Sequence, residues 1–279
     1  MTYVVKIGGG VDVATEAILD EVAQLVTSGQ RLVLVHGGSD LTNSMSERLG
    51  HPVRTVTSPN GMTSRYTDAE TLRIFAMSVV GEINTSLVAG LQRRSVNALG
   101  LSGVDGRLLL ARRKATVRTV TPEGRTIVLR DDHTGQIESV DDVLLKMLMS
   151  VGYTPVIAPL ALSYEGERLN VDGDRAAAAI AAALHSEALA IMTNVPGLLS
   201  NPGDLSSVIS HIPSDYLDEY MHYAQGRMRK KLLGAQEAIE GGVPRVLIGS
   251  RSLSAVLNGA GTTIEAVPVV SSWVHQFAE

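Results

Sequence analysis

Runs of aliphatic residues alternate along this chain with segments of helical periodicity, and this order constrains the fold more than any other feature. TYVVKI at the N-terminus is followed by a helical pattern over residues 14–28, then by RLVLVHGG and a second helical pattern over 41–49. Aliphatic strands joined by helices are typical of a parallel sheet that is covered on both faces. The same order returns after residue 141. We therefore predict an α/β fold, a three-layer α/β/α sandwich with a mainly parallel central sheet.

The stretch over residues 107–140 differs, because apolar and polar residues alternate there with a period of two. This pattern predicts a β-hairpin excursion with a turn near residues 122–124. The chain shows neither a linker of low complexity nor a repeat of fixed period. We therefore expect one domain over 1–279, with two functional halves over 1–169 and 170–279.

Two further local patterns predict elements that bear on the site. Thr67 to Glu70 has the form of a capping box, which predicts a helix from Thr67, as its cap, toward Arg94. TPVIAPLAL over 154–162 reads as one strand, and the Ala-rich stretch after Asp174 reads as a helix.

The composition excludes several kinds of protein and site. There are no cysteines, so disulfides and Cys-ligated metals are excluded, and the seven histidines lack metal-ligand spacing. A net charge of -5 argues against a protein that binds nucleic acid by neutralising phosphates. No basic leader or long uninterrupted apolar run is present. We expect a soluble cytoplasmic protein that does not associate with membranes.

Glycines follow several predicted strands, at the ends where parallel sheets bind ligands. Gly8-Gly9-Gly10 follows the first strand and Gly37-Gly38 the second, and later strands are followed by Gly100, Gly103 and Gly197. Each cluster alone could equally make a tight turn. Together they favour an anion site, although neither G-x-x-x-x-G-K-S/T nor G-x-G-x-x-G is present.

A lysine inside the first strand strengthens this interpretation. Lys6 stands directly before the first glycine cluster. Because burying an unpaired ammonium group is costly, an anionic ligand explains its position best. His36, by contrast, ends the second strand as a lone histidine, and we expect it to be packed and hydrogen-bonded without a chemical role.

Polar side chains before two predicted helices are further candidates. Asn170, Asp172 and Asp174 precede the Ala-rich helix, and one helix cap explains only one of them. We interpret Asp174 as a carboxylate that orients lysines and Asn170 as a group that faces substrate. Arg65 lies just upstream of Thr67, where it could bind a carboxylate through two hydrogen bonds or could be an exposed loop residue.

A cluster of cations begins the helix near residues 226–240. Its members are Arg227, Arg229, Lys230 and Lys231. Positive charges at a helix N-terminus oppose the helix dipole, which favours a functional role over a stabilising one. The alternative is a solvated basic face.

In this order, the motifs resemble those of the amino-acid kinase superfamily, specifically its acetylglutamate kinase branch, over essentially the whole chain. The matching segments are KIGGG at Lys6, HGGSD at His36, SRYTDAET at Ser64, GLSGVDG at Gly100, NVDGD at Asn170, TNVPGLL at Thr193 and GRMRKKL at Gly226. The resemblance implies the amino-acid kinase fold and the ATP- and Mg²⁺-dependent phosphorylation of a carboxylate.

The resemblance also implies a role for individual residues. Lys6 and Lys231 would stabilise the transition state, and Asp174 would organise them. The N-terminal half would bind the amino acid through Gly37, Gly38 and Arg65, together with Asn170 at the start of the other half, and Arg65 would hold the α-carboxylate. The C-terminal half would contribute most of the nucleotide site, whose residues would be Gly8, Gly9, Thr193, Asn194, Gly197, Leu198, Gly226 and Met228. The Mg²⁺ ion would be held mainly by ATP and by no protein side chain.

Within this branch the chain resembles most the LysZ type of kinase, which acts on aminoadipate or glutamate linked to the small acidic carrier protein LysW. The features are HGGSD in place of HGGG, the longer SPNGMTSRYTD, ARRKAT at Ala111 and GRMRKK. The resemblance implies a role in lysine biosynthesis, arginine biosynthesis or both. The first predicted strand starts at residue 3, which leaves no N-terminal helix like that of the arginine-sensitive hexameric enzymes, so we expect a homodimer. The departure at Ser39 leaves open how the role of the third glycine is met.

Local charge offers a docking site for such a carrier. Residues 112–130 contain the single acid Glu123 and the cations Arg112, Arg113, Lys114, Arg118, Arg125 and Arg130. We hypothesise that Arg112, Arg113 and Lys114 dock the acidic carrier, the alternative being a charged sheet edge that prevents aggregation.

Two alternative functions remain at this point. An acetylglutamate kinase would act on free N-acetylglutamate. A catalytically silent nucleotide or amino-acid sensor is less favoured, because Lys6, Asp174 and Lys231 are all present.

Overall fold

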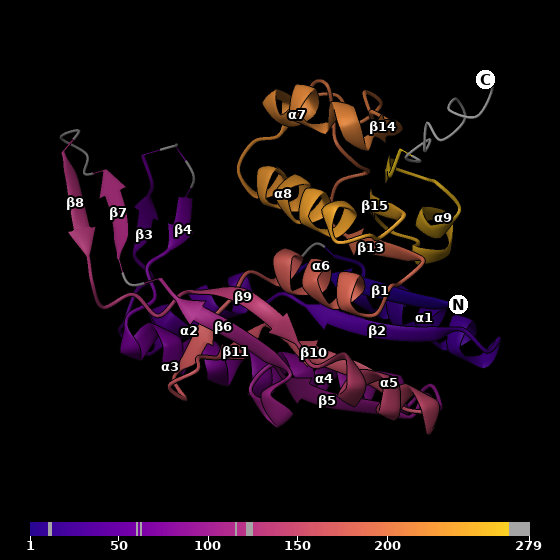
Figure 1. Ribbon diagram of the computed structural model, residues 1–279, viewed down its shortest axis with the longest axis horizontal. Coiled ribbons are helices and arrows are strands. Elements are labelled where there is room, and N and C mark those ends of the chain that lie inside the picture. Colours follow the sequence, from indigo (N-terminus) through magenta and orange to yellow (C-terminus); the bar gives the residue numbers. More distant parts are fainter. Residues whose placement is uncertain (11–12, 60, 62, 115, 121–124, 268–279) are drawn as a thin grey trace, which may run out of the picture.

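The computed structural model describes residues 1–10, 13–59, 61, 63–114, 116–120 and 125–267. Its largest sheet, within these residues, consists of β1 (Thr2–Ile7), β2 (Arg31–His36), β5 (Ala98–Ser102), β10 (Thr154–Ala158), β13 (Ala188–Met192), β14 (His211–Pro213), β15 (Arg245–Gly249) and β16 (Thr262–Glu265). The strand order is β14-β16-β15-β13-β1-β2-β10-β5, and every neighbouring pair is parallel except β15 and β16 (Figure 1). The predicted, mainly parallel sheet is confirmed.

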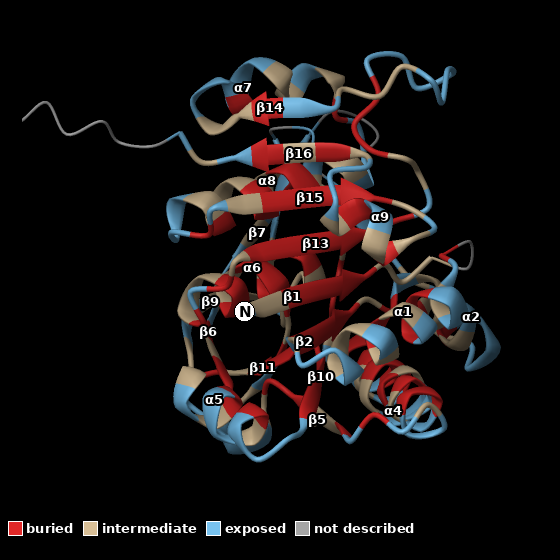
Figure 2. Ribbon diagram, turned by 90° about the vertical axis from the view of Figure 1, so that its right-hand side faces the viewer, coloured by how far each residue is buried: buried red, intermediate tan, exposed pale blue. Residues whose placement is uncertain are grey.

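Helices cover both faces of this sheet (Figure 2). One face is covered by α1 (Thr15–Thr27), α4 (Thr85–Gln92) and α9 (Leu253–Leu257), and the other by α5 (Asp142–Ser150), α6 (Gly173–Ala183) and α8 (Arg227–Glu240). Side chains alternate along β1, so that Val5 and Ile7 join the first layer while Val4 joins the second. The same alternation directs Lys6 toward the layer of α6 and α8.

A smaller sheet and two ribbons lie outside the large sheet, and the β-hairpin excursion over residues 107–140 supplies two strands of this smaller sheet and one whole ribbon. The sheet has the order β12-β11-β6-β9, with β6 (Leu109–Arg113), β9 (Gly135–Val140), β11 (Leu160–Leu162) and β12 (Arg168–Asn170). The ribbons are β3 (Thr55–Thr57) with β4 (Thr63–Arg65), and β7 (Val117–Val120) with β8 (Thr126–Leu129). They lie side by side (Figure 1), and the Thr57 N–H donates to Thr119 Oγ1 at 3.1 Å. The predicted turn at 122–124 lies outside the described residues.

The prediction of one strand over TPVIAPLAL was wrong. Residues 154–158 form β10 of the large sheet, and residues 160–162 form β11 of the smaller one. Pro159 separates them, because proline has no N–H with which to continue a strand ladder. The chain thus crosses between the two sheets at this proline.

The helix expected from Thr67 is present but begins two residues later. It comprises α3 (Ala69–Ala76), a π-helical segment over Met77–Asn84, and α4. Asp68 caps it, since its carboxylate accepts the Thr71 N–H at 2.8 Å. The choice of Thr67 as cap was therefore wrong, and the Thr67 hydroxyl instead accepts a hydrogen bond from Asn170 at 3.0 Å.

By length and mean hydropathy alone, the continuous helix over Ala69–Gln92 could cross a membrane. It is also a core element here, because Ile74, Val79 and Leu91 are completely buried in the protein. Core helices of folded proteins commonly show this composition.

Two short helices complete the described part. The helix α2 (Ser39–Arg48) follows β2 directly, and α7 (Leu217–Tyr220) precedes a 3₁₀ turn and the loop that leads into α8. The N-terminus of α2 thus lies beside the glycines that end β2, where it borders the site described next.

Candidate active site

A cavity of about 1250 Å³ opens at the carboxyl ends of β1 and β2. Most of the residues singled out from the sequence line it, namely Lys6, Gly8, Gly9, Gly37, Gly38, Arg65, Lys114, Asn170, Asp174, Thr193, Asn194, Gly226, Met228 and Lys231. Both halves of the chain contribute. The cavity therefore brings together groups that are more than 200 residues apart in sequence.

Two residues expected at the nucleotide site lie behind the cavity wall. Leu198 is 1% exposed, and its N–H donates to Thr262 Oγ1 at 2.8 Å. A Cβ on Gly197 would lie 2.6 Å from the same oxygen. These two residues shape the loop after β13 without lining the cavity.

At the floor of the cavity, two lysines share one aspartate. Lys6 Nζ lies 2.6 Å from Asp174 Oδ1, and Lys231 Nζ lies 3.1 Å from Asp174 Oδ2. All three residues are buried. We call Lys6, Asp174 and Lys231 the lysine–aspartate centre, and its net charge with all three groups ionised is positive.

Helix capping and close packing place the members of this centre. Asp172 caps α6 by accepting the N–H groups of Asp174 and Arg175 at 2.9 and 3.2 Å, which leaves Asp174 in the first helical turn. Lys231 lies on the buried face of α8. Gly234, on the same face, lets α8 approach α6, because a Cβ there would lie 3.2 Å from the Asp174 backbone.

The centre strongly perturbs its own ionisation. Burial raises the pKa of the Asp174 carboxyl, but the two neighbouring ammonium groups outweigh it and lower that pKa to about 2. Burial, together with repulsion from Lys6, lowers the pKa of Lys231, and Asp174 opposes this shift. The aspartate thus stays ionised, while a further anion at this place would favour the charged form of Lys231.

The two glycine turns after β1 and β2 pack directly against each other. A Cβ on Gly9 would lie 2.4 Å from the Gly38 nitrogen, and one on Gly37 would lie 2.8 Å from the Gly9 nitrogen. On its other side Gly38 contacts Val79 of the π-helical segment, where a Cβ would be 2.5 Å from Cγ1. The glycines therefore serve the tight turns, in which the N–H groups of Gly8 and Gly37 donate to the carbonyl oxygens of Met192 and Ile7 at 3.0 and 2.9 Å.

Arg65 lies on the wall of the cavity with one donor unused. Its Nη2 donates to the carbonyl oxygen of Ser39 at 3.1 Å and to Asn43 Oδ1 at 2.9 Å. Its Nη1 is buried and has no hydrogen-bond partner among the described residues. Burial lowers the pKa of the guanidinium to about 10, against attraction from Asp40. A buried, unpaired N–H at a cavity wall suits an anionic ligand.

Ser39, which departs from the glycine of the related motif, thus acts through its backbone, as an acceptor for Arg65. Next to it, Asp40 forms an ion pair with Arg227 at 2.7 Å, which joins the N-terminus of α2 to that of α8 across the cavity. Neither Asn43 nor Asp40 was singled out from the sequence, because their partners are distant in the chain.

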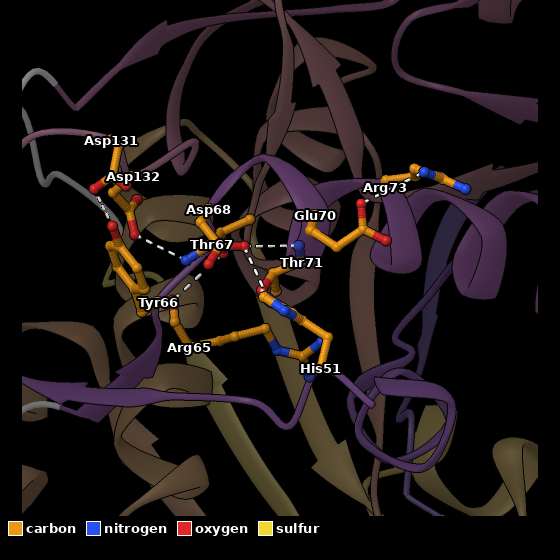
Figure 3. A network of polar contacts seen from close by, with 10 residues as sticks. All are labelled: His51, Arg65, Tyr66, Thr67, Asp68, Glu70, Thr71, Arg73, Asp131 and Asp132. Carbon is orange, nitrogen blue, oxygen red and sulfur yellow. Dashed lines mark hydrogen bonds and ion pairs between the residues drawn. The ribbon is translucent and has the colours of Figure 1, made fainter. Parts of the chain in front are cut away.

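The segment that carries Arg65 is held by a network of polar contacts (Figure 3). The Thr67 N–H donates to Asp132 Oδ2 at 3.0 Å, and the Tyr66 hydroxyl donates to Asp131. Asp68 bonds to His51 as well as capping α3. Asp131 and Asp132 come from the hairpin excursion, so that excursion is tied to the wall of the cavity.

His36 is packed and hydrogen-bonded, as expected from the sequence. Its Nδ1 lies 2.9 Å from the Gly37 oxygen and its Nε2 lies 3.1 Å from Asn84 Nδ2. Burial lowers its pKa to about 4, against the hydrogen bond with Gly37, and Lys6 lowers it further. Asn84 also donates to the Val156 oxygen at 2.9 Å, which connects the π-helical segment to β10. His36 is therefore neutral at neutral pH.

The three basic residues proposed as a carrier dock lie in different surroundings. Arg112 is exposed and pairs with Glu138 at 2.5 Å. Arg113 pairs with Glu167 at 2.9 Å and also donates to the Asp132 backbone oxygen. Lys114 alone borders the cavity. Partial desolvation by the surrounding protein and repulsion from Arg175 lower the pKa of Lys114. Lys114 is nevertheless exposed to solvent.

Within the described residues, no group of three histidine or acidic side chains is arranged to hold a metal ion. Any divalent cation at this site would therefore need most of its ligands from water or from a bound phosphate.

The amino-acid sequence is similar to a known protein family and to individual kinases. The pattern of the amino acid kinase family matches residues 1–250. A LysW-aminoadipate kinase of Deinococcus radiodurans is 49% identical over 94% of this chain and 90% of its own length. A LysW-aminoadipate kinase of Thermus thermophilus is 45% identical over 94% of this chain and 99% of its own.

Solved structures agree in fold. An N-acetylglutamate synthase of Neisseria gonorrhoeae matches with a TM-score of 0.76 at 24% identity, over 96% of this chain and 60% of its own. A carbamate kinase of Giardia lamblia, bound to AMP-PNP, matches with a TM-score of 0.67 at 16% identity. The match covers 95% of this chain and 98% of the carbamate kinase chain.

Proposed function

Because the chain belongs to the amino acid kinase family, we propose that it transfers the γ-phosphoryl group of ATP to the side-chain carboxylate of aminoadipate or glutamate linked to an acidic LysW-type carrier. The observation that carries the proposal is the lysine–aspartate centre, in which two buried ammonium groups share one carboxylate at the floor of a large cavity. Its product would be an acyl phosphate for lysine biosynthesis.

The centre suits phosphoryl transfer because this reaction needs positive charge and positioning more than covalent help. Lys6, in β1, and Lys231, in α8, would contact the oxygens of the transferred phosphoryl group from two sides. Asp174 would hold both amines in place. The acceptor is a carboxylate, already ionised at neutral pH, so no general base is required, and the neutral His36 need not serve as one.

The residues present fit a bound nucleotide. ATP would supply the phosphoryl group, and Mg²⁺ would neutralise part of the phosphate charge. Gly8 and Gly9 line the cavity from the end of β1, and Thr193, Asn194, Gly226 and Met228 line it from the C-terminal half. The excess positive charge of the centre favours the same anion.

Arg65 would bind the α-carboxylate of the amino acid. Its buried Nη1 has no partner in the described part of the chain, and Ser39 and Asn43 fix the orientation of its other terminal nitrogen. The Gly37–Gly38 turn and Asn170 also line the cavity. A charge-assisted hydrogen bond to this orphan donor would contribute about 1.5–3 kcal/mol.

The names of the similar kinases suggest a carrier-linked substrate, and charge suggests where the carrier reaches the site. Arg112 and Arg113 already pair with Glu138 and Glu167. Lys114 has no ion pair among the described residues and borders the cavity, so among these three residues it is best placed for a carboxylate of the carrier, and Arg118 of the same basic segment also lines the cavity.

We also expect a cytoplasmic homodimer. In support, Val143, Met147 and Val151 recur at helical spacing around α5 and are exposed, as apolar residues at subunit contacts would be in a monomer. Light scattering after size exclusion would give twice the chain mass if a dimer forms, and the single chain mass if it does not.

The substrate proposal is tested by trapping acyl phosphate with hydroxylamine. The protein is given ATP, Mg²⁺ and, in parallel, carrier-linked aminoadipate, carrier-linked glutamate or free N-acetylglutamate. We expect turnover of a carrier-linked substrate with kcat/KM at least about tenfold above that of N-acetylglutamate. A preference for N-acetylglutamate would replace the proposal with an acetylglutamate kinase, and no product from any substrate would favour a silent sensor.

A further inference from the structure

Asp132 is a buried carboxylate that lies outside the cavity, at the junction of three segments. It is 1% exposed and is absent from the cavity lining. Its Oδ2 accepts the Thr67 N–H at 3.0 Å, and its Oδ1 accepts the Thr134 N–H at 2.8 Å as well as the Thr134 hydroxyl. Its backbone oxygen accepts Arg113 Nε at 2.9 Å. It thus ties β6 and the start of β9 to the segment between β4 and α3.

This junction leads directly to two residues of the proposed amino-acid site. The His133 N–H donates to the Thr67 oxygen at 2.7 Å, and the Asn170 N–H donates to the His133 oxygen at 2.9 Å. The side-chain amide of Asn170 donates to Thr67 Oγ1 at 3.0 Å, and Arg65 is only two residues from Thr67. One carboxylate therefore lies at the centre of the contacts that fix Arg65 and Asn170 relative to each other, and Figure 3 shows its contact with Thr67 beside Arg65.

A carboxylate is an expensive way to hold a junction. Removing it from water costs several kcal/mol, and among the described residues its side chain forms no ion pair. Three hydrogen bonds from N–H and O–H donors offset that cost. A neutral side chain would hold the segments at a lower desolvation cost. The advantage of the carboxylate is that it has two acceptor oxygens, each of which binds a different segment.

We propose that Asp132 is a positioning residue, which sets the amino-acid site by fixing the segment of Arg65 and Thr67 against Asn170. It touches no substrate. This inference rests on the proposed function, because its readout is the binding of the amino-acid substrate.

Asp132→Asn tests it, with Asp131→Asn as the matched control. The amide keeps the shape of the Asp132 side chain but replaces one of its two acceptor oxygens by an NH₂ group. That group would face an N–H donor of Thr67 or Thr134, so one of these hydrogen bonds is lost. Asp131 is adjacent in sequence but exposed, and it bonds only to the Tyr66 hydroxyl among the contacts of Figure 3. The assay measures KM for carrier-linked aminoadipate, KM for ATP, kcat and the melting temperature of each variant.

We expect Asp132→Asn to raise KM for the amino-acid substrate about 10-fold or more, with KM for ATP changed less than about twofold. Asp131→Asn should change every constant less than about threefold. Should Asp132→Asn fail to fold, Thr67→Val removes the acceptor of the Asn170 amide together with the hydroxyl that donates to the Arg65 backbone oxygen at 3.4 Å, and it should raise the same KM about threefold or more, without affecting that for ATP.

Equal shifts in both KM values, or an unchanged KM for the amino-acid substrate in a folded Asp132→Asn, would overturn the positioning role. An inactive wild-type protein would instead contradict the proposed function, so the two failures are distinguishable.

Discussion

The lysine–aspartate centre and the hairpin excursion use positive charge in opposite ways. In the centre, Lys6 and Lys231 are buried and share one acid. In the excursion, Arg112 and Arg113 each have an acid of their own, and the Arg112 side chain is 77% exposed. A buried cation that shares its counter-ion with another cation has a large electrostatic interaction energy with a phosphate that binds beside it. An exposed cation with its own counter-ion has a small interaction energy with any anion. We therefore propose that the first region carries the chemistry and that the second serves recognition of the carrier.

The sharpest test of this contrast replaces Lys231 by methionine, which keeps the length of the side chain and removes its charge. We expect kcat to fall by about 10²–10³-fold, because a preorganised charge that stabilises the transition state is lost. Arg229→Met, in the same helix but exposed, serves as control and should leave kcat within about threefold. Equal kcat values for the two variants would remove the distinction between buried and exposed cations.

Burial next to the lysine–aspartate centre, at His36, should also be visible in the dependence of stability on pH. The pKa of His36 is lowered from 6.5 to about 4 in the folded protein. Between these values the unfolded chain binds a proton that the folded protein does not, so stability falls as pH decreases from about 6.5 to about 4. The loss attributable to His36 is about 3 kcal/mol.

Urea unfolding of the wild type and of His36→Gln at several pH values measures this loss. The difference between the two proteins should shrink or reverse as the pH falls, because only the wild type has a histidine to protonate. Parallel curves across this range would mean that His36 is not held neutral by its surroundings.

Arg65 lies between the two regions, and its replacement should have an intermediate effect. Arg65→Met should raise KM for the amino-acid substrate about 10–100-fold, since the charge-assisted bond from Nη1 to a carboxylate is lost. Arg65→Lys should restore little of the lost substrate affinity, because lysine lacks the planar guanidinium group that also donates to Ser39 and Asn43. Arg73→Met, which removes an exposed arginine of α3, is the control. A variant of Arg65 with normal KM would exclude it from substrate binding.

The smallest effects are expected in the hairpin excursion. Lys114→Ala should lower kcat/KM for the carrier-linked substrate about 3–10-fold, with no change for N-acetylated substrates. Arg112→Ala should change either value less than about twofold, because Arg112 is exposed and paired. The loss in Lys114→Ala should disappear in high salt, as expected for an electrostatic contact. If Arg112→Ala has the larger effect, the carrier docks on the outer face of β6 instead.

Much of this arrangement follows from the sequence, because its determinants are local. The period of two in β1, together with the layers predicted on both faces, directs Lys6 to one layer of helices, and Asp172 fixes Asp174 in the first turn of α6. The separation of β10 from β11 at Pro159 was missed, because an aliphatic run does not reveal that its two ends pair with different sheets. Likewise, Asp68 and Thr67 are both good caps, and only the contact of Thr67 with Asn170 decides between them.

The tertiary contacts of the site could not be predicted in this way. Asp132 reads as one acid in a polar turn, and its role depends on Thr67, 65 residues away in the chain. Arg113 and Lys114 are adjacent and equally basic in the sequence, yet one pairs with Glu167 and the other borders the cavity. Such differences arise from the register and twist of the hairpin excursion, which local patterns do not encode.

The most direct test of the account is a single-turnover measurement on Asp174→Asn. With ATP, Mg²⁺ and carrier-linked aminoadipate bound at saturation, verified by calorimetry, the rate of acyl phosphate formation is followed by rapid quench. If Asp174 holds the two lysines for phosphoryl transfer, the rate should fall at least about 100-fold, while both substrates still bind. A folded Asp174→Asn protein that transfers the phosphoryl group at the wild-type rate would contradict the assignment of the lysine–aspartate centre.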